Sequence, residues 1–344
     1  MEKSNRWLQL LLLAITLLFA VIIAYGIWTW HSTSAAIMTK SSKSSVQKIQ
    51  DKKPFSVLIM GTDVGALGRG TSYAGNTDTM ELLTVNPVKQ TMTITAIPRD
   101  TLVKVNTSKG ADYVKINAAY AIGGASEAKK QVSKLLDVPV DYYALMNMGT
   151  LEKVVNAVGG VNVNNPFAFT YEGHHLKKGQ QHLNGKTALK YSRMRYDDPD
   201  NDYGRQRRGQ QIIESTIESF KRHGSISAAN KIMTAVKDGV RTDAPINDIA
   251  SLYLNYHVAL NNVRREQFRG KNAIIEGISF QIATPQEINR VSKVTRESLG
   301  LMPKSSVEND QTRMVALQTK WDGYENLNFE LPNHALYNQP GSGK

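Results

Sequence analysis

The densest group of chemically active side chains lies in residues 191–211, YSRMRYDDPDNDYGRQRRGQQ, which hold five arginines and four aspartates. Arg193 and Arg195 are two positions apart, so in extended backbone both side chains would point to the same side. Two guanidinium groups on one side favour an anion, and arginine binds phosphate through two parallel hydrogen bonds. A solvated charged stretch is the alternative, as for most charge runs.

Residues 204–222 have helical spacing, and the apolar side chains between Ile213 and Phe220 define one face of the expected helix. Arg205 lies about 50° from the centre of that face, Arg208 about 110° and Arg207 about 150°. We therefore expect Arg205 to point inward and Arg207 to point outward.

An inward-pointing arginine needs an anionic partner, because an unpaired buried charge is strongly unfavourable. Asp200 or Asp202 could be that partner, and Arg205 would then have a structural role. A bound phosphate is the functional alternative.

Two aspartates are candidates for a metal site. Asp63, in GTD, follows the apolar run 55–60, and Asp78, in NTD, precedes the apolar run 79–86. The ends of neighbouring strands can converge, and Mg²⁺ typically takes one or two protein carboxylates, with water and substrate phosphate in its other positions. Each aspartate considered alone is more often a turn or capping residue.

Two further basic side chains lie near the same predicted strand ends. Arg99, in IPRD, follows the apolar run 91–97, and Lys115 begins the motif KINAAY. Ligands in α/β folds commonly bind at strand ends, so both side chains are candidates for anion binding. Asn117 has the simpler alternative of capping the helix that follows.

The elements that must position these residues alternate between strand and helix, which predicts a layered α/β domain. Strands are expected at 55–60, 79–86, 91–97, 142–148, 161–164 and 274–280, and helices at 117–136, 150–158, 204–222, 226–239, 246–260 and 284–299.

The N-terminal region contains 24 residues without a charged side chain, from Trp7 to Trp30. Such a segment spans a bilayer core of about 30 Å as a helix. Aromatic residues lie at both ends and Lys3 and Arg6 precede it, which indicates a transmembrane signal anchor with its N-terminus inside. A cleaved signal peptide is the alternative.

The predicted domain organisation follows from these segments. The expected parts are a cytoplasmic N-terminus at 1–6, a transmembrane anchor at 7–30, an extracytoplasmic stalk at 31–54, a catalytic domain at 55–302 and an irregular C-terminal segment at 303–344.

Composition restricts the possible chemistry. The formal net charge of +12 makes phosphates, nucleic acid and anionic lipids plausible partners. Cysteine is absent, which excludes disulfides, a thiol nucleophile and a cysteine-based zinc site. A metal would be held mainly by oxygen or histidine ligands.

Together the motifs GTD, NTDTM, IPRDT and KINAAY, the pair GG at 159–160 and the arginine-rich stretch resemble the LytR-CpsA-Psr family of cell-wall glycopolymer transferases. The resemblance runs from about Phe55 to Gln211 and implies an α/β/α domain with a mixed central sheet. Such a domain would hold a polyprenyl pyrophosphate in an apolar tunnel, with the pyrophosphate at its mouth.

The resemblance also implies roles for individual residues. Asp63 and Asp78 look like the groups that organise Mg²⁺ or another hard divalent cation such as Mn²⁺, although Asp63 could instead hold an arginine in place. The pyrophosphate ligands would be Arg99, Lys115, Arg193, Arg195 and Arg205.

The implied reaction is transfer of a glycosyl phosphate, carrying teichoic acid, capsular polymer or a related glycan, from a polyprenyl pyrophosphate donor to a peptidoglycan hydroxyl. The expected location is the membrane of a Gram-positive-type cell envelope, with a single span and an extracytoplasmic catalytic domain. Three alternatives remain: a pyrophosphatase acting on the same lipid, a noncatalytic wall-binding scaffold, and a membrane-tethered nucleic-acid binder that attenuates transcription. The basic composition alone suggests the last, but no DNA-reading motif is present, and we do not expect nucleic acid as a partner.

Overall fold

In a computed structural model, the described residues are 43–62, 75–108, 110–223, 232, 234, 239–245, 254–335 and 337. The predicted anchor at 7–30, Asp63 and most of the two helices expected at 226–239 and 246–260 lie outside these residues. Within the described ranges, no helix is both long enough and apolar enough to cross a membrane.

A six-stranded mixed sheet forms the centre of the domain, in the order β11-β6-β1-β2-β3-β12. Strand β1 is antiparallel to β2 and parallel to β6, while β3 is antiparallel to β2 and parallel to β12. The strands are β1 (Phe55–Thr62), β2 (Thr77–Asn86), β3 (Thr91–Ala96), β6 (Tyr142–Asn147), β11 (Val240–Thr242) and β12 (Asn262–Gln267). The mixed sheet predicted from the family resemblance is confirmed.

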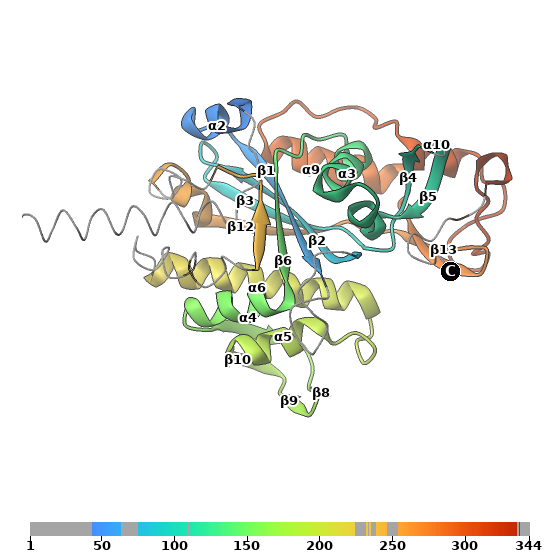
Figure 1. Cartoon of the computed structure of the whole chain (residues 1–344). Helices are drawn as coiled ribbons and strands as arrows, with labels where there is room; N and C mark the ends of the chain where they lie inside the picture. Colours follow the sequence, from blue (N-terminus) through green and yellow to red (C-terminus); the bar gives the residue numbers. More distant parts are fainter. Residues whose placement is uncertain are drawn as a thin grey trace, which may run out of the picture.

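Helices cover both faces of the sheet, as Figure 1 shows. One face carries α3 (Ala119–Leu136), preceded by the 3₁₀ turn η1 (Ile116–Ala118), and α9 (Pro285–Ser298). The other carries α6 (Asn201–His223), with α4 (Met148–Ala157) and α5 (Gly185–Arg193) beyond it. The α/β/α layers are therefore confirmed.

Alternation along the central strands explains why both faces are covered. In one buried cluster Leu58 and Leu82 pack with Val132 of α3, whereas Leu83 belongs to a second cluster with Ile213 of α6. Successive side chains of a strand point to opposite faces of the sheet. Because apolar side chains lie on both faces of these strands, each face needs a layer of helices to cover it.

Four two-stranded hairpins or ribbons surround this core. They are β4 (Leu102–Thr107) with β5 (Gly110–Lys115), β7 (Val161–Asn165) with β10 (Gly179–Leu183), β8 (Phe169–Tyr171) with β9 (His174–Leu176), and β13 (Lys271–Ile275) with β14 (Ile278–Ile282). The single strand expected at 274–280 is wrong, because Glu276 and Gly277 have left-handed φ values of 50° and 78° and reverse the chain.

The segments on either side of the predicted catalytic domain pack against it. Part of the expected solvated stalk is the helix α2 (Lys43–Gln50), whose Ile49 is buried, and the Tyr256 hydroxyl, just before η3 (His257–Asn261), donates to the Lys53 carbonyl at 2.9 Å. The stalk prediction is wrong for these residues, because burial of Ile49 fixes the helix against the domain.

The expected irregular C-terminal segment contains one short helix, α10 (Asp310–Ala316), and the 3₁₀ turn η4 (Pro332–His334). Its Met314, Phe329 and Leu331 form a buried cluster with Phe280 of β14. The part of this segment that the structure describes is therefore folded onto the hairpin β13–β14.

Candidate functional site

A cavity of about 470 Å³ lies between the central sheet and the helices α4, α5 and α6. Its apolar lining includes Ile59, Leu83, Met92, Met146, Leu151, Val154, Leu189, Ile212, Ile213 and Ile217. The lining residues of α6 extend from Arg205 to Ile217, which corresponds to about 18 Å of helix at 1.5 Å per residue. The cavity is therefore long enough to hold an extended hydrocarbon chain of about the same length.

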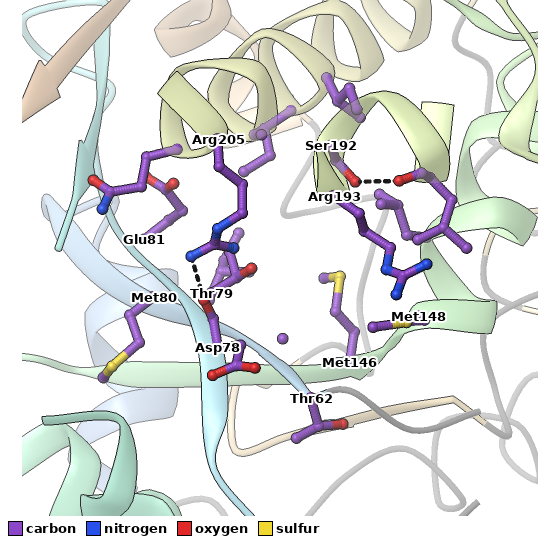
Figure 2. Close-up of a pocket in the computed structure, with 18 of the residues that line it drawn as sticks. Thr62, Asp78, Thr79, Met80, Glu81, Met146, Met148, Ser192, Arg193 and Arg205 are labelled. Carbon is purple, nitrogen blue, oxygen red and sulfur yellow. Dashed lines mark hydrogen bonds between the residues drawn. The ribbon is translucent and has the colours of Figure 1, made fainter. Parts of the chain in front are cut away.

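Charged residues line one end of this cavity. Arg99, Arg193, Arg195 and Arg205, together called the arginine cluster below, all belong to the lining, as does Asp78. Asp78 lies near the start of β2, Arg99 in the turn after β3, Arg193 at the end of α5, Arg195 in the loop that follows, and Arg205 near the N-terminus of α6. Figure 2 shows Asp78, Arg193 and Arg205 around the same space. The sequence prediction that these residues converge is thereby confirmed.

Asp202 is the common partner of three members of the arginine cluster. Its Oδ1 lies 2.9 Å from Nε of Arg205, 3.7 Å from Nε of Arg99 and 3.8 Å from Nε of Arg195. Burial raises the pKa of Asp202, but the charge and hydrogen bonds of Arg205 outweigh that effect, so the pKa lies below its usual value. Asp202 is therefore ionised at neutral pH and holds the guanidinium groups together.

The two aspartate partners proposed for Arg205 are thus distinguished by the structure. Asp202 pairs with Arg205, whereas Asp200 pairs with Arg207, whose side chain is exposed. The wheel prediction of an inward Arg205 and an outward Arg207 is confirmed.

Asp78 connects the start of β2 to the arginine cluster. Its Oδ1 lies 3.0 Å from Nη1 of Arg99, and its backbone carbonyl accepts from Nη2 of Arg205 at 2.8 Å. Asn117 donates to the same Oδ1 at 3.3 Å, and the cap of α3 uses no side-chain hydrogen bond. Asn117 therefore positions Asp78 instead of capping a helix.

Arg193 and Arg195 reach the cavity by a different route from the one expected. Arg193 is the last residue of α5, so the extended backbone assumed for the pair is wrong. Its guanidinium pairs with Glu172 and lies over the ring of Tyr171, 5.9 Å from the centroid. Both arginines nevertheless line the same cavity.

Among the residues that the structure describes, Asp100 links Lys115 to the arginine cluster. Its Nζ lies 2.8 Å from Oδ1 of Asp100, whose Oδ2 lies 3.8 Å from Nε of Arg99. The ammonium group also lies 5.4 Å from the ring centroid of Phe280. Lys115 is thus adjacent to the cavity and does not belong to its lining.

Several buried polar atoms at the charged end have no hydrogen-bond partner among the described residues. They are Nε of Arg99, Nε of Arg195 and Oγ1 of Thr62 at the end of β1. The carboxylate oxygens nearest the two Nε atoms lie 3.7–3.8 Å away, beyond hydrogen-bond distance. Because buried donors are nearly always satisfied in folded proteins, these atoms indicate a site for an anionic ligand.

Burial lowers the pKa of Arg99, but the neighbouring Asp78, Asp202 and Asp100 outweigh it and raise the pKa above its ordinary value. Arg99 therefore stays cationic, and an anion at this end of the cavity would meet permanently charged donors.

Arg208 is the arginine of this segment that the sequence did not place. It is 2% exposed, pairs with Asp198, and donates from Nε to the carbonyl of Tyr191 at 3.0 Å. Its other contacts are the Met194 carbonyl and the ring of Phe169. The wheel angle of about 110° gave no signal for this burial, because the partners come from the preceding loop and from α5.

The match to known proteins covers most of the chain. The LytR_cpsA_psr family model matches residues 24–297. This chain belongs to the LytR_cpsA_psr family. Biofilm regulatory protein A of Streptococcus mutans is 36% identical over 92% of this chain and 82% of that protein. The polyisoprenyl-teichoic acid–peptidoglycan teichoic acid transferase TagU of Enterococcus faecalis is 35% identical over 87% of this chain and 99% of its own length.

The fold of this family member is also that of a solved relative. The crystal structure of Bacillus subtilis TagU matches with a TM-score of 0.55 and 35% identity, over 72% of this chain and 97% of that one. The family recognised from sequence motifs is confirmed.

Of the two predicted metal ligands, the structure describes Asp78. Among the described residues, no group of three or more histidine and acidic side chains could hold a metal ion. Asp78 lines the charged end of the cavity, and Thr62, the last residue of β1, pairs with Thr77 of β2. Oxygen donors at this position are of the kind that Mg²⁺ prefers.

Proposed function

We propose that this chain is a phosphotransferase that moves a glycosyl phosphate from a polyprenyl pyrophosphate carrier to a peptidoglycan hydroxyl. The observation that carries the proposal is an apolar cavity that joins the arginine cluster, where Nε of Arg99 and Nε of Arg195 are buried without a hydrogen-bond partner among the described residues. Relatives named as teichoic acid transferases support the same chemistry. The polymer would be teichoic acid, capsule or a related glycan.

In this proposal the polyprenyl chain lies along α6 towards Ile217, and the pyrophosphate contacts the arginine cluster. An acceptor hydroxyl attacks the phosphorus that carries the glycan. The P–O bond to the acceptor forms, the P–O bond to the lipid phosphate breaks, and the hydroxyl proton passes to the leaving polyprenyl phosphate. Charge accumulates on the nonbridging and leaving oxygens, and preorganised guanidinium donors stabilise that charge more than they stabilise the ground state. Asp202 acts indirectly, by holding the arginines in position.

We further propose that Asp63 and Asp78 hold Mg²⁺ or Mn²⁺. Such an ion would neutralise charge on the pyrophosphate oxygens when bound. Asp78 would supply a carboxylate oxygen to such an ion at the charged end of the cavity, and Asp63 directly follows Thr62 in the chain.

The proposed location is the cell membrane of a bacterium with a Gram-positive-type envelope. The uncharged segment 7–30 would anchor the chain by a single span, and the catalytic domain would face outward. The catalytic domain can then reach both substrates, because the lipid carrier lies in the membrane and the acceptor lies in the wall.

A transfer assay tests the proposed function. The full-length protein is incubated with a polyprenyl pyrophosphate-linked oligosaccharide and peptidoglycan oligomers, with Mg²⁺ or with a chelator. We expect a phosphodiester-linked product whose rate falls about 10²–10³-fold in Arg205→Ala, the usual cost of one lost transition-state donor. Chelation should also suppress the product.

The matched control is Arg207→Ala, because Arg207 lies on the same helix and pairs with Asp200 at the surface. It should retain transfer. Release of free glycosyl phosphate without coupling would replace the transferase by a hydrolase, and equal activity of Arg205→Ala would remove the arginine cluster from the mechanism.

A further inference from the structure

A carboxyl group that the proposed reaction does not use lies in the wall of the apolar cavity. Glu81 of β2 is 1% exposed, lines the cavity and extends towards α6 beside Arg205, as Figure 2 shows. Its neighbours across the sheet are Ile59 of β1 and Ala96 of β3, neither of which can satisfy a carboxylate. A buried carboxyl in this position needs an explanation.

The groups that surround Glu81 provide little stabilisation for a negative charge. From α6, Gln210 Nε2 donates to Glu81 Oε2 at 3.4 Å, but it donates at 2.8 Å to the carbonyl of Glu266 on β12. Arg205 is the cation that acts on Glu81, and its guanidinium already contacts Asp202 and the carbonyl of Asp78.

Burial outweighs both of these groups and raises the pKa of Glu81 to about 8. At neutral pH the side chain is therefore a neutral acid with one proton to donate.

A second polar side chain of the cavity lining has unused hydrogen-bonding capacity. Gln206 is 7% exposed, and its Nε2 donates to Asp202 at 3.1 Å, while its Oε1 has no partner among the described residues. Because this Oε1 is an acceptor, it offers nothing to a phosphate oxygen. The protonated carboxyl of Glu81 is a donor in the cavity lining, and it lies near Arg205, the arginine that the proposed reaction assigns to the pyrophosphate.

Resting on the transferase proposal, we infer that the buried carboxyl of Glu81 contacts the lipid-proximal phosphate and donates a hydrogen bond to it. Arg205 and Glu81 then hold the phosphate from the two walls of the cavity. The ligand class is a polyprenyl phosphate or pyrophosphate, because the apolar lining binds the hydrocarbon chain and the Glu81 carboxyl donates to a phosphate oxygen.

Ionisation of Glu81 would reverse this contribution in three ways. A carboxylate cannot donate a hydrogen bond, and it would repel a phosphate in a site of low dielectric constant. It would also compete with the phosphate for Arg205. Binding of the lipid is therefore coupled to the protonation of Glu81, and affinity falls as the side chain ionises.

Binding of geranylgeranyl pyrophosphate to the full chain, measured by calorimetry between pH 6.5 and 9.5, tests this inference. In the wild type, Kd should rise above about pH 8 and approach a tenfold increase per pH unit. Glu81→Gln keeps a neutral donor, so its affinity should resemble the wild type at pH 6.5 and lack that alkaline rise. Glu81→Leu should bind about tenfold more weakly at pH 6.5, as expected when one hydrogen bond to a charged group is lost.

The outcomes separate this inference from the proposed function. Identical alkaline weakening in the wild type and Glu81→Gln would overturn the role of Glu81, as would wild-type affinity in Glu81→Leu at pH 6.5. If neither the wild type nor Glu81→Gln binds the probe at any pH, the proposed function fails and this inference fails with it. A melting curve of each variant checks the fold, and the Gln variant remains decisive if the Leu variant is unfolded.

Discussion

Two sets of arginines from the same short segment, 191–211, serve different purposes. Arg208 is buried with Asp198, and its guanidinium also donates to the backbone of Tyr191 and Met194. In the arginine cluster, by contrast, Nε of Arg195 is buried without a hydrogen-bond partner among the described residues. Arg208 thus holds α5 and the loop before α6 against α6, whereas Arg195 lines the cavity with a donor that no described residue uses.

This difference shows that charge density alone does not identify a binding site. An arginine whose donors are all used by protein oxygens has nothing left for a ligand, however many charges surround it. The useful signal is a buried donor that lacks a partner and faces a cavity.

The largest effect that we expect is the loss of folding stability when the buried Arg208 is replaced. Arg208→Ala leaves Asp198 as a buried unpaired charge, so the free energy of unfolding should fall by about 3–5 kcal/mol, measured by denaturant titration. Arg207→Ala is the control, because its exposed pair should contribute less than about 1 kcal/mol. If Arg208→Ala lowers the free energy of unfolding no more than Arg207→Ala does, Arg208 does not have the structural role proposed for it.

A smaller effect is expected at Asp202, which contacts members of the arginine cluster. Asp202→Asn should lower the free energy of unfolding by about 1.5–3 kcal/mol at pH 7, the range for hydrogen bonds to charged groups, and should also slow transfer. Because the native pKa of Asp202 is depressed, its stabilising contribution is present above the ordinary aspartate value near 3.9 and is lost as pH falls through the native value.

The difference between the wild type and Asp202→Asn should therefore shrink in acid, as measured by melting temperature between pH 2 and 7. A difference that stays constant across that range would show that Asp202 acts without its charge.

The sequence predicted the parts of the fold that have strong local patterns. The runs that became β1, β2 and β3 are continuous and apolar because both faces are covered, and Arg205 was placed by helical periodicity alone. Family motifs located Asp78 and Arg99, which the structure brings within 3.0 Å.

The features that sequence reasoning missed depend on long-range contacts. Burial of Arg208 requires oxygens from α5 and from the following loop, and burial of Glu81 is evident only when α6 packs over β2. The hairpin at 271–282 was predicted as one strand, because Glu276 and Gly277 were not recognised as a turn that reverses the chain. Helix α2 is held by a tyrosine far along the chain, which no local pattern indicates.

The most direct test of the central claim is an experimental structure of the full chain with a polyprenyl pyrophosphate bound. The account predicts that the hydrocarbon chain lies along α6 towards Ile217, and that the pyrophosphate accepts hydrogen bonds from Arg205 and from the Nε atoms of Arg99 and Arg195. A lipid bound elsewhere, or phosphates that leave those Nε atoms unpartnered, would contradict it.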